Sequence, residues 1–522
     1  MMQKTLKQRL LDFYHIDEER YADLIAPSTI EDFAIGHHFD RMEEAVSLVK
    51  EAIDHLQRVA IYGDYDADGV MGTSILVKMF QYVHYPVDYY IPSRYLDGYG
   101  LTLKYAQKAV ENGVGLLITV DNGVSAFEGI EYLHNHGVKV LVLDHHTIQD
   151  TLPLADIIIH PTFSHFGETP SSGAFTAFMF ASAFLGRVDK YLAMLASISL
   201  ISDMMPLLDY NRRLLKACIS AYEDDEFLAI DLLKDGERFD ENSIGMKIAP
   251  KINALGRMIE DDQINRIVLF FTSENREEIL NYLNWINQTN EERKEASKSA
   301  TLDIKDVPQE NGAIVIISDV KEGLLGLIAN HLCSTYHVPT IVFAKEQNED
   351  VFKGSCRAPV GFNVVDAFNK LSDLTLAAGG HALAGGCSIK AEDFPLFKKR
   401  FIELVKNTPI EEYKEEIIPL GLTEINFANY ELVNSFSPFG ESWPSPTFAI
   451  SHILTSSLMY SRNNEHILTY IGQGVKLIGF NMGKEELSAY RYVDFKGRMK
   501  TSTYRGQTTL EFAIKSYQES KK

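Results

Sequence analysis

Three short apolar segments of this chain each run directly into acidic or imidazole side chains. They are residues 59–63, followed by Asp64, Asp66 and Asp68; residues 116–120, followed by Asp121; and residues 138–143, followed by Asp144, His145 and His146. The carboxyl ends of neighbouring strands in an open parallel sheet meet at one crevice, so these side chains should gather in one small volume. Carboxylates crowded in this way repel one another unless cations lie between them. Oxygen and imidazole ligands suit Mn²⁺ or Mg²⁺, and paired divalent ions cleave phosphate esters, so the pattern predicts a two-metal phosphodiesterase.

The first of these segments places its aspartates at alternating positions. Alternate residues of an extended segment point to one side, and Gly69 lets the backbone turn sharply after them. A calcium loop or a helix N-cap would use similar residues. Because an EF-hand loop lies between two helices, whereas a strand is predicted before Asp64, the pattern favours a different kind of metal site.

The remaining acidic positions differ in how specific they are. Asp121-Asn122-Gly123 is also a common turn sequence. Asp203 follows an apolar helix predicted over residues 192–201, where a solvated helix-end residue is an equally good interpretation. Asp144-His145-His146 is more specific, because a strand that ends in a carboxylate and two imidazoles has few structural uses.

The composition indicates a globular chain of several domains. It has 522 residues, of which 45% are hydrophobic and 23% charged, and chains of this size contain about three or four domains. The net charge of −22 argues against a general attraction of the whole chain to nucleic acid, although it does not exclude a local basic surface. The four cysteines are far apart, which supports neither a disulfide framework nor a zinc module.

The sequence lacks recognisable targeting and cofactor-binding motifs. The N-terminus lacks the apolar core of a secretory signal, and the apolar residues 174–186 are too few to cross a bilayer. We therefore expect a cytoplasmic protein without a membrane partner. The sequence contains neither a Walker A loop nor a Gly-x-Gly-x-x-Gly motif, so no motif supports binding of a nucleoside triphosphate or a nicotinamide cofactor.

The order of predicted elements suggests an α/β protein with a β-rich C-terminal part. Residues 1–55 read as helical, and strands then alternate with helices up to residue 143, which predicts a parallel sheet flanked by helices. A mostly helical part ends near residue 272, and residues 274–306 form a long connecting helix. A smaller α/β domain follows. Past Pro409, short alternating runs predict an all-β barrel or sandwich.

The last 32 residues combine positive charge with aromatic rings. Residues 491–522 contain eight lysines or arginines and three acidic residues. The interleaved aromatic residues are Tyr492, Phe495, Tyr504, Phe512 and Tyr517. Single-stranded nucleic acid needs such a surface, with cations for its backbone and rings for its bases, so this segment predicts strand binding.

Taken together, these motifs resemble a known family, the RecJ-type single-strand-specific exonucleases of the DHH/DHHA1 phosphoesterases. The four acidic motifs, which end with Ser202-Asp203, have that family's order and approximate spacing. Further matches are residues 90–94, 98–101, 249–257, 354–357, 379–382, 438–440 and 443–446. The resemblance covers nearly the whole chain from about residue 35.

The resemblance implies a domain plan. It consists of an N-terminal helical extension (residues 1–55), a DHH catalytic domain (56–272), a connecting helix (273–306), a substrate-binding DHHA1 domain (307–408) and an OB-fold nucleic-acid-binding domain (409–522).

The resemblance also implies site residues. The implied ligands of two Mn²⁺ or Mg²⁺ ions are Asp66, Asp68, Asp121, Asp144, His145 and Asp203, with Asp64 and His146 as further catalytic members. The implied substrate-binding residues are Asn253, Arg257, Ser355, Arg357, Gly379, Gly380 and His381. Glycines let backbone amides approach a phosphate, and arginines supply paired donors to it. A tight turn and surface salt bridges are the structural alternatives for these residues.

The expected activity is 5′ to 3′ digestion of single-stranded DNA to mononucleotides in repair and recombination, with a helicase and a single-strand-binding protein as partners. Two alternatives are a DHH phosphodiesterase of short oligonucleotides, cyclic dinucleotides or pyrophosphate, and a catalytically silent strand-binding scaffold. The chain departs from common family residues at His160, where asparagine is usual, at Val320-Lys321, which replaces Trp-His, and at Ala378, which replaces Phe. None of these changes removes an implied metal ligand.

Overall fold

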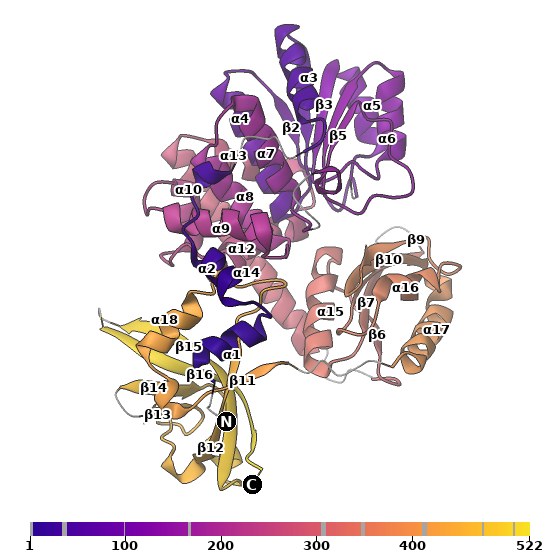
Figure 1. The fold of residues 1–522 in the computed structure, drawn as a ribbon. Coiled ribbons are helices and arrows are strands. Elements are labelled where there is room, and N and C mark those ends of the chain that lie inside the picture. The colour runs from indigo at the N-terminus through magenta and orange to yellow at the C-terminus, as the bar shows by residue number, and fades with distance from the viewer. Residues whose placement is uncertain are drawn as a thin grey trace. The chain divides into compact units, whose positions relative to one another are not determined.

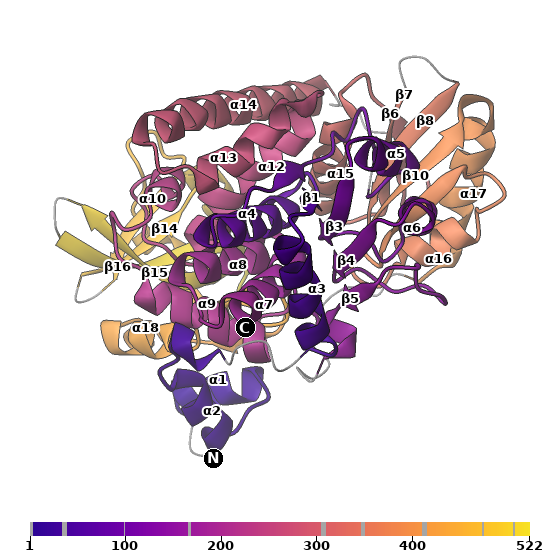
Figure 2. The ribbon, with the colours of Figure 1, turned by 90° about the horizontal axis from the view of Figure 1, so that it is seen from above.

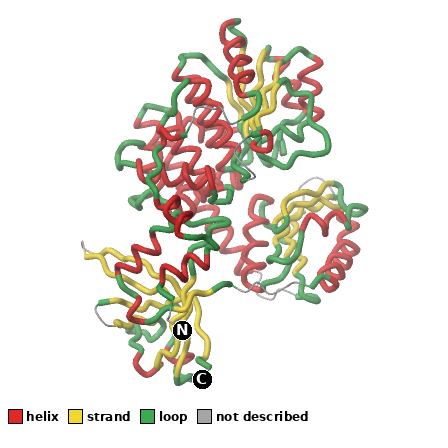
Figure 3. Tube along the Cα trace, in the orientation of Figure 1, coloured by secondary structure: helices red, strands yellow, loops and turns green. Residues whose placement is uncertain are grey.

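The computed structural model describes residues 4–33, 39–98, 100–164, 169–303, 309–345, 350–409, 415–471, 474–504 and 507–521. The chain forms two compact units. The larger comprises Ile30–Met205 and Ala221–Tyr413, and the smaller comprises Met1–Thr29, Pro206–Ser220 and Lys414–Lys522. Figure 3 shows the strands gathered into separate sheets, two in the larger unit and one in the smaller.

The first sheet of the larger unit is parallel throughout. Its strands are β1 (Arg58–Tyr62), β2 (Asp88–Tyr90), β3 (Val114–Val120), β4 (Lys139–Leu143) and β5 (Ile157–Ile159), in the order β2-β1-β3-β4-β5. Residues of β3 and β4 alternate between two buried faces, which is why these strands are almost continuously apolar. The predicted parallel α/β sheet is confirmed, and all of its strands point their carboxyl ends to one edge.

Helices cover both faces of this sheet (Figure 1). Helices α5 (Leu103–Glu111) and α6 (Phe127–Asn135) pack on one face, where Ala106 and Ile130 join a core with Tyr62 and Val140. On the other face lie α3 (Met42–Asp54), α4 (Ala67–Tyr82) and α7 (Gly173–Leu185). Residues 67–80 of α4 are all buried, so the helix that follows the first acidic loop is held on every side.

A helical layer follows in the larger unit. Its main members are α8 (Lys190–Ser202), α10 (Leu228–Lys234), α11 (Glu241–Ser243), a π-helix (Ile244–Ile248), α12 (Ala249–Met258), α13 (Arg266–Thr272) and α14 (Arg276–Asp303). The long helix α14 runs beside α12 and α13 (Figure 2). It is the predicted connecting helix, and the predicted boundary between residues 306 and 307 lies outside the described residues.

The second sheet of the larger unit is mixed. Its strands are β6 (Ile314–Ile317), β7 (Thr340–Lys345), β8 (Val351–Arg357), β9 (Ala377–His381) and β10 (Ala384–Lys390), in the order β6-β7-β8-β10-β9. Helices α15 (Glu322–Tyr336), α16 (Val364–Asn369) and α17 (Phe394–Asn407) accompany it. Its core includes Phe343, Phe397 and Phe401. This is the smaller α/β domain expected from the sequence.

The smaller unit is built around a six-stranded sheet in the order β11-β12-β15-β16-β14-β13. The strands are β11 (Ile417–Pro419), β12 (Thr447–Leu454), β13 (Ile467–Ile471), β14 (Val475–Gly479), β15 (Tyr492–Tyr504) and β16 (Gln507–Glu519), with helices α18 (Phe427–Asn434) and α19 (Lys484–Leu487). The predicted β-rich C-terminal part is confirmed. Among the described residues, no helix is both long and apolar enough to cross a membrane.

Two segments distant in the sequence complete the smaller unit. Helices α1 (Leu6–Phe13) and α2 (Glu18–Ile25) belong to it, as does most of α9 (Asp209–Ala221). The ring of Tyr14 stacks on Trp443 with 4.2 Å between centroids. The guanidinium of Arg212 donates to the carbonyl oxygens of Phe436 and Pro438, each at 2.7 Å. These contacts attach the first 29 residues and residues 206–220 to the C-terminal sheet.

Candidate active site

The loop between β1 and α4 presents the first three aspartates. Asp66 is the N-cap of α4, and its Oδ1 accepts the N–H of Gly69 at 3.1 Å. A Cβ atom on Gly69 would lie 2.6 Å from backbone and side-chain atoms of Asp64, so only glycine fits this close turn. The loop therefore places its carboxylates at the start of a buried helix.

Asp68 joins this loop to a second helix. Its two carboxylate oxygens accept the N–H groups of Gly173 at 2.7 Å and Ala174 at 2.8 Å, at the beginning of α7. The positive end of a helix dipole stabilises a carboxylate there. Ser172 caps the same helix and accepts the N–H of Phe175. Asp68 is thus held in place by its neighbours before any ligand binds.

Asp121 follows β3 directly and adopts a left-handed backbone with φ of 62°. Its N–H donates to the carbonyl oxygen of Leu143, which ties the ends of β3 and β4 together. Its side chain is buried, and among the described residues Oδ1 accepts no hydrogen bond. An orphaned carboxylate oxygen in the interior is costly unless a cation binds it.

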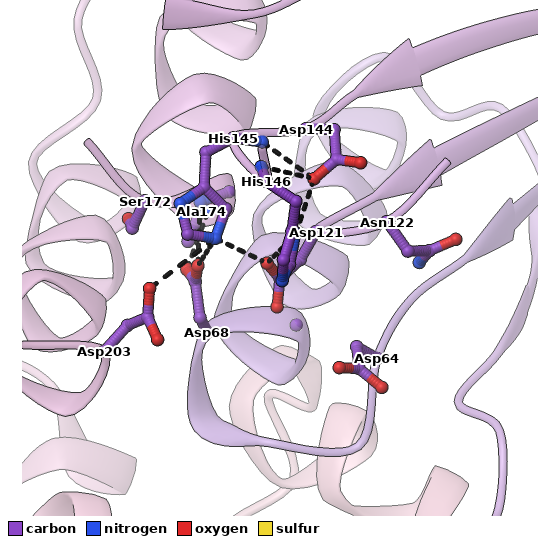
Figure 4. A network of polar contacts seen from close by, with 12 residues as sticks. Asp64, Asp68, Asp121, Asn122, Asp144, His145, His146, Ser172, Ala174 and Asp203 are labelled. Atoms are coloured by element: carbon purple, nitrogen blue, oxygen red, sulfur yellow. Dashed lines mark hydrogen bonds and ion pairs between the residues drawn. The ribbon is translucent and has the colours of Figure 1, made fainter. Parts of the chain in front are cut away.

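His145 lies where three carboxylates converge (Figure 4). Its Nε2 is 3.1 Å from Oδ1 of Asp121, 3.5 Å from Oδ2 of Asp203 and 3.6 Å from Oδ2 of Asp68. Burial lowers the pKa of His145 to about 4, so the ring is neutral at pH 7 and has a lone pair for a metal. Asp203 reaches this point as the C-cap residue of α8.

The structure therefore brings together seven of the eight predicted catalytic residues. Among the described residues they form three groups of potential ligand atoms, each within 4.8 Å: Asp121, His145 and His146; Asp68, His145 and Asp203; and Asp64, Asp66 and Asp121. The first group shares one member with each of the others. Four loops far apart in the sequence contribute to this cluster.

Electrostatics confirms that these carboxylates are crowded. Burial, with the charge of Asp66, raises the pKa of Asp64 to about 8. Burial, with the charges of Asp68 and Asp66, raises the pKa of Asp203 to about 9. The pKa of Asp121 is raised well above its ordinary value for the same reasons. Without cations the cluster therefore favours protons over negative charge.

Asp144 lies beside the cluster but differs from its other members. Its Oδ1 accepts the N–H groups of His145 at 2.7 Å and His146 at 3.2 Å, and lies 2.8 Å from His146 Nδ1. Its Oδ2 accepts the N–H of Val124 at 2.9 Å. Burial would raise the pKa of Asp144, but the hydrogen bond and charge of His146 hold it well below its usual range. Both oxygens are engaged, so this carboxylate is suited to orienting His146.

His146 and His160 continue this hydrogen-bonded arrangement. Burial opposes charge on His146, but its bond to Asp144 raises its pKa to about 9. His160 Nδ1 accepts the N–H of Thr162 at 3.1 Å, so the proton is on Nε2, which donates to the carbonyl oxygen of His146 at 2.9 Å. His160 was noted in the sequence only as a departure from the family. Its contact with the backbone of His146 places it in the support of the site.

The charges of Arg94 and Arg257 interact with that of Asp66. The guanidinium of Arg94 lies 4.2 Å from the ring centre of Tyr65. Burial, with the charges of Arg94, Arg357 and Arg293, lowers the pKa of Arg257 to about 10, and Asp66 opposes this shift. Arg257 also donates to the carbonyl oxygen of Gly323 at 3.1 Å. Arg94 was absent from the predicted site, although it lies in a quoted motif.

The other predicted substrate-binding residues occupy different settings. Asn253 Oδ1 accepts the N–H of Ala67 at 2.9 Å, so it supports the start of α4. Arg357 donates to Ser355 Oγ at 3.1 Å. The glycines and histidine Gly379, Gly380 and His381 lie on β9, which is exposed along its whole length at the edge of the second sheet. Only Gly380 has a positive φ, 138°.

The interpretation of the C-terminal aromatics as a base-stacking set is wrong in part. Phe495 and Phe512 are fully buried in the core of the six-stranded sheet, because alternate residues of β15 and β16 face inward. Two of the basic side chains are paired: Lys500 with Glu511 at 3.4 Å and Lys515 with Glu415 at 3.6 Å. Exposed aromatic residues in this unit include Phe427, Tyr470 and Phe480.

Comparison with protein families yields three matches in the order of the chain. The DHH family N-terminal domain matches residues 58–201, the DHHA1 domain residues 309–407, and the RecJ OB domain residues 418–516. The parallel sheet with its aspartate and histidine edge and the second α/β domain thus define a phosphoesterase of the DHH class. With the third domain, the chain belongs to the RecJ family.

Curated relatives and solved structures agree with this assignment. The single-stranded-DNA-specific exonuclease RecJ of Bacillus subtilis is 29% identical over 509 residues, covering 93% of this chain and 64% of the relative, so the chain spans less than two thirds of that protein. The RecJ of Haemophilus influenzae is 29% identical, covering 98% and 95%. The structure of Thermus thermophilus RecJ in complex with Mn²⁺ has a TM-score of 0.85 at 23% identity, covering 99% and 76%, which shows a common fold.

Proposed function

We propose that this chain is an exonuclease that hydrolyses single-stranded DNA from the 5′ end to mononucleotides, in DNA repair and recombination, with Mn²⁺ or Mg²⁺. The observation that carries the proposal is the convergence of seven carboxylate and imidazole side chains in three overlapping groups. Relatives that bear the name of single-stranded-DNA-specific exonuclease support the substrate, and the manganese and magnesium complexes of Thermus thermophilus RecJ support the metal.

The residues present fit two divalent cations. The group of Asp64, Asp66 and Asp121 shares no member with the group of Asp68, His145 and Asp203, so each group would hold one ion. The orphaned Oδ1 of Asp121 and the raised pKa values of the carboxylates fit the same conclusion. Bound ions would supply a nucleophilic hydroxide and neutralise charge on the phosphate, so no protein nucleophile is needed.

Within this site the chain's own residues bind and orient. We assign Asp144 to positioning His146 rather than to ligation, because hydrogen-bond donors occupy both of its oxygens. Arg94, Arg257 and Arg357 would bind phosphate groups of the strand, since guanidinium groups donate to two phosphate oxygens at once. The charges of Arg94 and Arg257 interact with that of Asp66, so positive charge acts on the carboxylate cluster.

The remaining assignments follow the family. Gly379, Gly380 and His381, on their exposed edge strand, would contact the strand backbone, and the C-terminal domain would hold the strand further from its end. The five sequence segments stay our proposal for the functional domains, except that residues 1–29 and 206–220 pack with the C-terminal segment. A cytoplasmic location is supported by four buried free cysteines, and a helicase and a single-strand-binding protein are the proposed partners.

A labelled-strand digest tests the proposal. Single-stranded oligonucleotides labelled at the 5′ or the 3′ end are incubated with protein and Mn²⁺ or with EDTA. We expect 5′ label to appear at once as mononucleotide, and no product with EDTA. Asp121→Asn should abolish digestion, whereas the matched Asp225→Asn, exposed and also left-handed with φ of 67°, should retain it.

The same experiment separates the rivals. Faster hydrolysis of a dinucleotide than of a long strand would indicate a phosphodiesterase of short substrates. Strand binding without any Mn²⁺-dependent product would indicate a silent scaffold. Either result contradicts the proposed function.

A further inference from the structure

A second cavity lies in the helical layer of the larger unit. It has a volume of about 530 Å³ and is bounded by α10, the π-helix, α12 and α14. Figure 2 shows α10 and α12 beside the long helix α14. The volume is in the range of roughly 300–1,000 Å³ typical of small-molecule sites. None of the predicted catalytic or substrate-binding residues lines it.

The lining of this cavity is strongly polar. Its charged and amide residues are Asp231, Asp235, Lys247, Lys251, Asn287, Asn290, Glu291, Arg293 and Lys294, and its apolar residues are Leu232, Met246, Pro250 and Leu283. A cavity of this composition suits a ligand that carries charge and hydrogen-bonding groups. The apolar residues provide a limited surface for a flat ring.

Two of its cations have no carboxylate partner among the described residues. Lys251 is buried, and its Nζ donates to the carbonyl oxygen of Leu233 at 2.9 Å. Arg293 donates to Oδ1 of Asn290 at 2.8 Å, while its buried Nε has no acceptor. Burial lowers the pKa of both side chains, and the charges of Asp235 and Glu291 on Lys251, and of Glu291 on Arg293, only partly offset it.

The acidic residues of the cavity are already engaged. Glu291 pairs with Lys294 at 2.7 Å, and Asp235 lies 3.9 Å from Lys247. Asp231 Oδ1 accepts the hydroxyl of Tyr222 at 2.7 Å. The lining therefore has four cations against three carboxylates, an excess of one positive charge, and neither Lys251 nor Arg293 forms an ion pair among the described residues. Oδ2 of Asp231 is buried and accepts no hydrogen bond among the described residues, so it could accept one from a ligand.

We propose that this cavity binds a nucleoside monophosphate, with the phosphate at Lys251 and Arg293. The sugar or base would donate to Asp231 and exchange hydrogen bonds with Asn287 and Asn290, while the base would contact Leu232 and Leu283. Lysine and arginine are the usual partners of a phosphate dianion, and charge-assisted hydrogen bonds are the strong ones. This site is separate from the proposed nuclease site, and its occupation does not depend on hydrolysis.

Calorimetry on the full chain tests this binding. The protein, in EDTA so that no strand or ligand is hydrolysed, is titrated with 5′-dAMP, with inorganic phosphate and with deoxyadenosine. We expect saturable binding of 5′-dAMP that is tighter than binding of either fragment. Lys251→Met and Arg293→Gln should each weaken it by about tenfold or more, since each removes a charge-assisted hydrogen bond to the phosphate.

Matched variants keep the test decisive. Lys298→Gln, an exposed lysine on α14 outside the cavity, should bind 5′-dAMP as the parent does. Arg257→Gln tests instead whether 5′-dAMP binds at the proposed strand site, to which we assign Arg257. Because Lys251 is buried, thermal unfolding is measured to confirm that Lys251→Met still folds. Arg293 is only half-buried, so Arg293→Gln is a second, independent test of the cavity. Loss of binding in Arg257→Gln with retention in both cavity variants, equal binding of inorganic phosphate, or no saturable binding overturns the proposal.

Discussion

Nδ1 of His146 lies 2.8 Å from Oδ1 of Asp144, a contact that fixes the orientation of the imidazole ring. Asp144 is fully buried and also accepts the backbone N–H groups of His145 and Val124. A carboxylate held by so many donors fixes the ring that it binds. The first residue of the Asp-His-His sequence thus organises the other two.

Replacement of Asp144 should therefore weaken metal binding without removing a ligand. Asp144→Asn replaces one carboxylate oxygen by an amide that cannot accept the hydrogen bonds made at that position. We expect Mn²⁺ affinity to fall by about 10- to 100-fold, as is typical when a partner of a ligating histidine is lost. Calorimetric titration with Mn²⁺ measures this, with Asp225→Asn as control. Parent-like affinity would show that His146 needs no such support.

Metal binding should release protons near neutral pH. The pKa values of Asp64, about 8, and Asp203, about 9, imply that both are largely protonated at pH 7 in the metal-free protein. Ligation requires their carboxylates, so Mn²⁺ must displace those protons. Titrations at pH 7 in buffers of different ionisation enthalpy should give different heats. The difference should shrink at about pH 9.5, and identical heats at pH 7 would refute the raised pKa values.

The same shifts predict how the metal-free protein responds to pH. An acid whose pKa is raised on folding favours the folded state most fully below its unfolded pKa, about 3.9 for aspartate. The advantage is lost as pH rises towards the folded values of about 8 and 9. In EDTA, the unfolding temperature of Asp203→Asn should therefore rise relative to that of the parent between pH 5 and about pH 9. A constant difference between the two proteins across this range would contradict the expectation.

His160 should be replaceable by asparagine but not by leucine. Its Nδ1 caps the N–H of Thr162 and its Nε2 donates to the carbonyl oxygen of His146. Asparagine also offers one acceptor and one donor and is a good N-cap residue, whereas leucine offers neither. We expect His160→Asn to retain most strand digestion, and His160→Leu to lose about 1 kcal/mol or more of stability. Urea unfolding and the labelled-strand digest measure both effects; equal behaviour of the two variants would exclude the capping role.

Gly173 should tolerate no side chain, because of its distance from Asp121. A Cβ at this position would lie 2.7 Å from Asp121 Cβ and 2.9 Å from Oδ1, closer than non-bonded atoms approach. Gly173→Ala should displace Asp121 and lower Mn²⁺ affinity and strand digestion together. Gly245→Ala is the matched control, because its Cβ would make only an ordinary contact of 3.5 Å with Ile201. Unchanged metal affinity in Gly173→Ala would show that Asp121 can move without loss.

Local patterns predicted the catalytic cluster because parallel strands impose a simple rule. Apolar runs that end at Asp64, Asp121 and Asp144 form strands of one sheet, and parallel strands end at the same edge. Patterns could not assign Asp144 to a positioning role, since that depends on the donors around each oxygen. They could not identify the supporting role of His160 either, because its hydrogen bond to the backbone of His146 forms only in the folded chain.

The C-terminal domain shows the same difference between what local sequence patterns predict and what only the fold decides. Alternation in residues 492–514 correctly predicts strands, but it does not say which face is buried, and Phe495 and Phe512 belong to the core. The sequence also predicted that the first residues are helical. The sequence did not predict that these residues pack on the C-terminal domain, because the stacking of Tyr14 on Trp443 joins positions more than 400 residues apart.

The amino-acid sequence by itself determined the class of the fold, the order of its domains and the identity of the acidic and imidazole residues, because periodicity and strand-end chemistry are local properties. Only the tertiary structure decided which oxygens are free for a cation, which aromatic rings are exposed, and which cations are buried without an ion pair in the cavity beside α14. Those properties depend on contacts between distant segments, since burial and hydrogen bonding are set by whatever the fold brings alongside each side chain.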